Sequence, residues 1–144
     1  WLLANSSHVI DLAFHLGGKP MEWNCWHAGS LEWHQSSSRF CGAGATDQGV
    51  NFSYFADWEA PGRWSLEVLT RKRRLIFLPM EQLYIITMGS TKSVQFELDN
   101  ELDVKYKSGL YRQTEAFLKS QTERMLPLAE QVIMTEIYSK MAGY

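Results

Sequence analysis

Hydrophobic positions at helical spacing open the chain, and alternating hydrophobic positions fill its middle. The first stripe consists of Val9, Leu12, Ala13 and Leu16. Residues 5–7 (Asn-Ser-Ser) before the stripe are capping residue types, and Gly17-Gly18 after it is a stop signal. This pattern predicts a short amphipathic helix over residues 8–16.

The next two thirds of the chain carry strand patterns. Residues 21–33 predict one long strand, or a strand with a turn at Gly29-Ser30. Residues 35–48 are rich in Ser and Gly and show no periodicity, so we expect a loop there. Five further strands are expected at 50–57, 64–70, 74–78, 83–88 and 93–98. Because short connections join them, antiparallel pairing is expected.

The end of the chain returns to helical spacing, over 110–121 and, after Leu126-Pro127, over 129–141. Strands followed by helices predict an α+β fold: an open, mostly antiparallel sheet with helices packed on one face. Segments such as 75–78 are apolar on both faces. We therefore expect the other face to be covered by a second copy of the sheet in a homo-oligomer.

Composition narrows the possible partners. The 144 residues suit one domain with a core, and the net charge of −2 argues against a nucleic-acid partner. The basic run 71–74 favours a solvated turn, with a phosphate-binding patch as the alternative. Two cysteines without a secretory signal indicate a reducing, cytoplasmic setting, although a single disulfide stays possible. No stretch approaches the roughly 20 apolar residues of a membrane helix, so no membrane partner is expected.

His8 is the first candidate for chemistry. A helix start favours the neutral form of an imidazole, which can accept a proton from a substrate hydroxyl when an alcohol is oxidised. Asn5 could bind substrate hydroxyls, and Asp11 lies one turn from His8 on the same face. The alternative is that His8 packs and Asn5 caps the helix.

The segment 56–64 is the second candidate. Trp58 can stack on a sugar ring, and Arg63 with the nearby acids can bind its hydroxyls. A hairpin corner held by Arg63 and Asp57 explains the segment as well. Two weaker patterns lack the required context. The glycine-rich run 42–46 has neither the strand nor the helix of a dinucleotide loop, and the spacing of Cys25, His27, His34 and Cys41 matches no zinc site.

Several of these segments, in this order, resemble one enzyme family. Residues 5–12 with 16–18 are similar to the His-x-x-Asp helix that opens the C-terminal domain of the glucose-fructose oxidoreductase/inositol dehydrogenase/MocA (Gfo/Idh/MocA) family. The central run 49–83, the segment 111–117 and the final helix resemble later parts of that domain. The resemblance covers nearly the whole chain.

The resemblance implies that residues 1–144 are a C-terminal substrate-binding and oligomerisation domain, and that the N-terminal Rossmann domain binding NAD or NADP is absent from this chain. The start at Trp1 fits that expectation. His8 matches the catalytic His of the family, and Asn5, Asp11, Trp58 and Arg63 are expected to contact a carbohydrate substrate. In this family an acidic residue often stands four positions before the catalytic His. The corresponding position in this chain is occupied by Ala4. A non-catalytic ligand-binding or oligomerisation module of the same family is therefore the alternative to an oxidoreductase.

Overall fold

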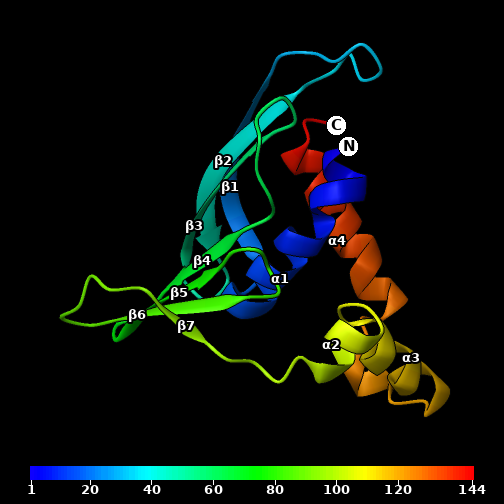
Figure 1. Ribbon diagram of the computed structural model, residues 1–144. Helices are drawn as coiled ribbons and strands as arrows, with labels where there is room; N and C mark the ends of the chain where they lie inside the picture. The colour runs from blue at the N-terminus through cyan, green and yellow to red at the C-terminus, as the bar shows by residue number, and fades with distance from the viewer. The chain divides into compact units, whose positions relative to one another are not determined.

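The computed structural model describes residues 1–144, which form two compact units. The first comprises Trp1–Gly62 and Val132–Tyr144, and the second comprises Arg63–Gln131. Four α-helices and two open antiparallel sheets confirm the predicted α+β class (Figure 1). The expected strands are divided between a three-stranded and a four-stranded sheet, where one sheet was expected.

The first unit combines two helices with the three-stranded sheet. A π-helical turn, η1 (Leu2–Ser6), leads directly into α1 (Ser7–Gly17), which confirms the predicted first helix. The strands are β1 (Pro20–Ala28), β2 (Arg39–Thr46) and β3 (Asn51–Asp57), in the order β1-β2-β3. The helix α4 (Leu128–Met141) contributes its part from Val132 onward to this unit.

The central strand β2 lies in the segment where a loop was expected, so that expectation is wrong. Gly42 and Gly44 made the strand unpredictable from the sequence, because glycine has no side chain that would show the alternation of a strand and has low strand propensity. A Cβ at Gly44 would collide with the backbone and side chain of Trp23, and one at Gly42 with the ring of Tyr54. The two glycines therefore let large aromatic side chains from β1 and β3 lie over the central strand.

The core of the first unit lies on one face of its sheet. Figure 1 shows α1 and α4 on the same side of the three strands. The buried residues are Leu2, Ile10, Phe14, Phe40, Met134, Tyr138, Met141 and Ala142. The rings of Phe14 on α1 and Phe52 on β3 pack edge to face, with centroids 5.1 Å apart. Helices from both ends of the chain thus cover one sheet face.

The second unit begins with four short strands in sequential order. They are β4 (Leu66–Leu69), β5 (Arg73–Phe77), β6 (Leu83–Thr87) and β7 (Val94–Phe96). The short helices α2 (Glu101–Lys105) and α3 (Leu110–Leu118) and a 3-10 turn over Thr122–Arg124 follow, before the first residues of α4. The strands expected at 64–98 and the helix expected over 110–121 are confirmed, whereas α2 was not foreseen.

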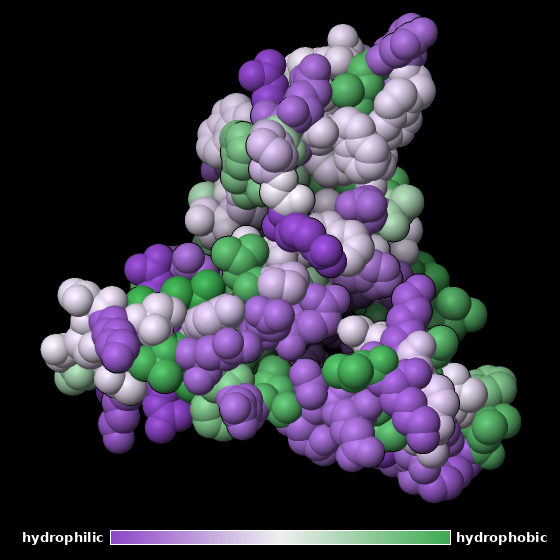
Figure 2. Space-filling view, in the orientation of Figure 1, coloured by the Kyte–Doolittle hydropathy of each residue, from purple (hydrophilic) through white to green (hydrophobic).

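One face of the second sheet is largely apolar. Paired residues in an antiparallel sheet share a face, so the register defines two apolar rows across the strands and a third, polar row on the same face that pairs Arg73 with Thr87. This apolar face consists of Leu66, Phe77, Leu83 and Phe96 in one row and Val68, Leu75, Ile85 and Val94 in the other. None of the eight residues is buried. Figure 2 shows hydrophobic residues at the surface beside these strands, between hydrophilic ones.

Candidate functional site

His8 is the second residue of α1, and its side chain is exposed. The opposite side of the helix is fixed in the core through Ile10 and Phe14, which are both buried. His8 is therefore an accessible imidazole on a rigid support. Ala4, one turn earlier, is exposed as well and offers no polar group beside it.

Helical backbone begins earlier than predicted. The N–H of Asn5 donates to the carbonyl of Trp1 at 2.8 Å, and Ser6 has helical φ and ψ without a side-chain capping bond. Ser6 thus stands at the N-cap position within the predicted capping segment, but its side chain makes no capping bond. Because η1 precedes α1, the N–H groups left open at a helix start lie near Leu2 and not beside His8.

Asp11 lies one turn after His8 and contacts the other helix of the first unit. Its carboxylate accepts a hydrogen bond from the hydroxyl of Tyr138 on α4. Tyr138 is almost fully buried, and burial together with this bond raises the pKa of its hydroxyl above the ordinary value. Asp11 therefore joins α1 to α4, a structural role that the sequence did not indicate.

Trp58 belongs to an aromatic cluster of the first unit. Its ring centroid lies 5.3 Å from that of Trp1 and 5.3 Å from that of Trp33. Phe40, 5.1 Å from Trp1, ties the cluster to the core. Trp33 is 60% exposed and Trp58 44% exposed, so both indoles keep surface that a ligand ring can contact.

The serines at 36–38, interpreted as a plain polar loop, are well ordered next to this cluster. Ser37 and Ser38 are buried. The hydroxyl of Ser38 donates to Glu59 Oε2 at 2.8 Å, and the indole N–H of Trp1 donates to the carbonyl of Ser37 at 3.2 Å. The segment therefore holds the aromatic cluster in place.

Two histidines join the same network, which the sequence analysis missed. His34 Nδ1 lies 3.0 Å from the carbonyl of Ser37, which can only accept, so Nδ1 carries the proton. In the neutral ring, Nε2 then accepts from the hydroxyl of Tyr144 at 2.8 Å. His27 Nδ1 lies 3.1 Å from the hydroxyl of Ser37. No regular spacing links these residues, so only the paired strands reveal the network.

Arg63, the remaining predicted substrate contact, is exposed and is the first residue of the second unit. It belongs to a different compact unit from the other four predicted site residues. Asp57, which was paired with Arg63 in the alternative interpretation, accepts the backbone N–H of Glu59 at 2.9 Å. That bond closes the turn after β3 within the first unit.

The cysteines and the glycine-rich run both lie on the three-stranded sheet. Cys25 faces Gly42 and Cys41 faces Trp26 in the register, so the two thiols point to opposite faces of the sheet, and both are free. No group of three or more His, Cys, Asp or Glu side chains is placed to hold a metal ion. The run 42–46 is part of β2, and its two glycines lie in close contact with Trp23 and Tyr54.

The chain matches no family model, and a search of curated proteins and of solved structures finds no match. None of its helices has the length and apolar character that crossing a membrane requires.

Proposed function

We propose that this chain is the substrate-binding domain of an NAD(P)-dependent oxidoreductase that acts on a sugar, a polyol or a sugar derivative by hydride transfer. The observation that carries the proposal is the exposed imidazole of His8 on a helix fixed in the core. An alcohol that loses a hydride also loses its hydroxyl proton. A neutral imidazole is a suitable acceptor for that proton near pH 7.

The surroundings of His8 support a carbohydrate as the substrate. Asn5 lies three residues before His8 on the same helical segment and carries an amide that can bind hydroxyls. Trp1, seven residues or roughly 10 Å of helix before His8, packs against the partly exposed Trp58. Asp11 completes the proposed substrate contacts of the first unit with the carboxylate surface that Tyr138 leaves open.

The cofactor is assigned to another part of the protein. The glycine-rich run of this chain is a central strand filled by aromatic side chains, so these residues do not fit a dinucleotide. We therefore assign NAD or NADP to a Rossmann domain outside these 144 residues. The contribution of this chain is the proton acceptor and the substrate contacts. Its two free thiols on opposite sheet faces support a reducing, cytoplasmic location.

The test compares two histidines of α1 in the native protein that contains this chain. Replacing His8 with Ala should lower kcat/KM for sugar or polyol oxidation at least about a hundredfold, as for loss of a general base. His15→Ala is the matched control, because His15 is also exposed and stands near the other end of the same helix. Equal activity of the His8→Ala variant and the control would overturn the role of His8.

A non-catalytic ligand-binding or oligomerisation module is the second candidate function. It is favoured by Ala4, which supplies no carboxylate beside His8, and by the apolar face of the second sheet. In both functions we propose that a second copy of the chain covers that face, because eight apolar side chains in two rows form a large patch for a monomer.

The oligomer can be tested on the edge strand β7. Val94 and Phe96 are each 53% exposed on the apolar face, while Gln95 between them points to the opposite face. Val94→Lys with Phe96→Lys should convert the oligomer into monomers, as measured by analytical ultracentrifugation. Gln95→Lys should leave the oligomer intact. A monomeric wild-type protein, or dissociation by Gln95→Lys alone, would contradict the interface.

A further inference from the structure

Two connections of the second sheet lie at the same end of it. They join β4 to β5 and β6 to β7, and alternate turns of an antiparallel sheet share an end. The N–H of Met88 donates to the carbonyl of Lys72 at 2.9 Å and links the two connections directly. With Arg73, the first residue of β5, they carry four cationic residues, which we call the cationic end: Arg71, Lys72, Arg73 and Lys92.

The positive charge of the cationic end is not compensated locally. No Asp or Glu occurs from Val68 to Met80 or from Gln82 to Gln95. The nearest acid, Glu67, accepts from Arg74 Nε at 2.9 Å and is thereby engaged with a fifth cation. None of the four cationic residues makes an ion pair. Four cations without an ion-pair partner thus stand at one end of the second sheet, in a chain whose net charge is −2.

The turn between β4 and β5 holds its cations in an ordered arrangement. The hydroxyl oxygen of Thr70 accepts the N–H groups of Lys72 at 3.3 Å and Arg73 at 3.0 Å. The same hydroxyl donates to the carbonyl of Arg73 at 2.9 Å. Such a turn presents charged side chains without first having to be ordered by a ligand.

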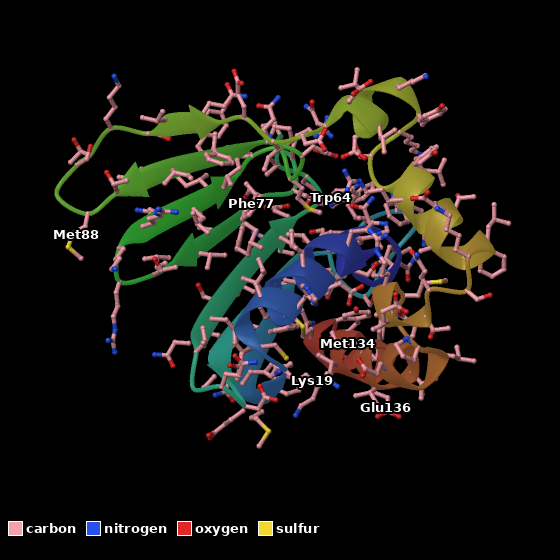
Figure 3. All side chains as sticks on the ribbon, turned by 90° about the horizontal axis from the view of Figure 1, so that it is seen from below. Lys19, Trp64, Phe77, Met88, Met134 and Glu136 are labelled. Atoms are coloured by element: carbon pink, nitrogen blue, oxygen red, sulfur yellow. The ribbon has the colours of Figure 1, made fainter.

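Two aliphatic side chains accompany the cations. Leu69 and Met88 are each 74% exposed, among the most exposed hydrophobic residues of the chain. Leu69 stands just before the β4–β5 turn, and Figure 3 shows Met88 at the far end of the sheet, pointing away from it. Exposed aliphatic residues next to cations are typical of surfaces that lie in the headgroup region of a membrane.

We propose that the cationic end docks this protein on the surface of a membrane that contains anionic phospholipids. The four cations contact phosphate and carboxylate groups of the lipids, while Leu69 and Met88 enter the boundary between headgroups and acyl chains. A single-stranded nucleic acid would need aromatic residues for stacking, and residues 69–73 and 88–93 contain none. This docking goes beyond the proposed oxidoreductase function and is independent of His8. It replaces the expectation of no membrane partner, which rested only on the lack of a membrane-spanning helix.

The test measures co-sedimentation of the protein with vesicles of phosphatidylcholine, alone or mixed with phosphatidylserine. Binding should require phosphatidylserine and weaken as the salt concentration rises. The triple variant Arg71→Ser, Lys72→Ser, Arg73→Ser should lose about a hundredfold in affinity, from roughly fivefold for each cation. The matched control removes three exposed lysines elsewhere in the second unit, by Lys105→Ser, Lys107→Ser and Lys119→Ser, and should bind like the wild type.

A second variant distinguishes the contribution of the inserted aliphatic side chains to vesicle binding from the contribution of the cations. Leu69→Ser with Met88→Ser keeps all four cations and should still weaken binding, because aliphatic burial in the interface is lost. Equal binding to vesicles of phosphatidylcholine alone, or equal losses in the triple variant and its lysine control, would overturn the proposal. Tighter binding to an RNA or DNA oligonucleotide than to anionic vesicles, lost in the same triple variant, would overturn it in favour of a nucleic-acid partner.

Discussion

The two units of this protein use similar antiparallel sheets in opposite ways. The sheet of the first unit has one face covered by α1 and α4, and eight hydrophobic residues are buried there. The sheet of the second unit carries eight apolar residues on one face, and none of them is buried. In the second unit only Ala116 reaches full burial. The first unit is therefore a closed core that can support a site, and the second carries an apolar face without buried residues, for which we propose a second copy as the partner.

The difference between the two units is tested most sharply by creating a cavity in each of them. Phe40 is 1% exposed at the centre of the first core, so Phe40→Ala should lower the free energy of unfolding by about 3–5 kcal/mol. Leu75 on the apolar face is only half-buried, so Leu75→Ala should cost well under half of that in the monomer. Urea denaturation measures both values. Equal losses would contradict the division into a closed and an open unit.

A smaller effect is expected from filling a space in the first sheet. Gly44→Ala places a methyl group against Trp23, so we expect a loss of about 1–3 kcal/mol from overpacking. Ala43→Ser is the control, because Ala43 is exposed on the same strand and faces the other way. The midpoint of thermal unfolding should be clearly lower for Gly44→Ala than for Ala43→Ser. If both unfold like the wild type, β2 is not packed under aromatic rings as described.

Gly42 and Gly44 also show why part of the fold could not be predicted from the sequence. The helix over 8–16 and the strands from 50 to 98 were predictable, because hydrophobic periodicity and turn residues indicate them directly. The central strand β2 was not, because two of its positions on the packed face, Gly42 and Gly44, are glycines whose space is filled by side chains from the neighbouring strands. The division into two sheets was also hidden, because periodicity reveals strands but not which strands pair.

The smallest predicted stability effect concerns the bond between α1 and α4. Tyr138→Phe removes the hydrogen bond to Asp11 and should cost about 1 kcal/mol. Because burial and the Asp11 carboxylate raise the pKa of Tyr138 above its ordinary value of 10.0, the unfolded protein loses this proton at a lower pH than the folded one. The stabilisation that comes from the raised pKa of Tyr138 is complete below about pH 10 and is lost as the pH rises further. Between pH 8 and 11 the free energy of unfolding should therefore fall less steeply in Tyr138→Phe than in the wild type. Parallel pH dependences of the two proteins would contradict this account.

The candidate site was predictable only in part. His8, Asn5 and Trp58 could be proposed from residue type and position, because helix faces and aromatic turns follow from local sequence. The bond between Asp11 and Tyr138 joins residues 127 positions apart, and the network of His34 with Tyr144 spans 110. Such pairs arise from packing of the two ends of the chain on one sheet, which no local pattern encodes.

The central claim is that His8 faces a substrate shared with a nicotinamide cofactor. Titration of the native protein that contains this chain with NADH and NADPH, followed by nicotinamide fluorescence, tests that claim most directly. A saturable change with at least one nucleotide, altered further by a polyol or sugar in the wild type but not in His8→Ala, is the predicted result. Absence of any change with either nucleotide would contradict the oxidoreductase function.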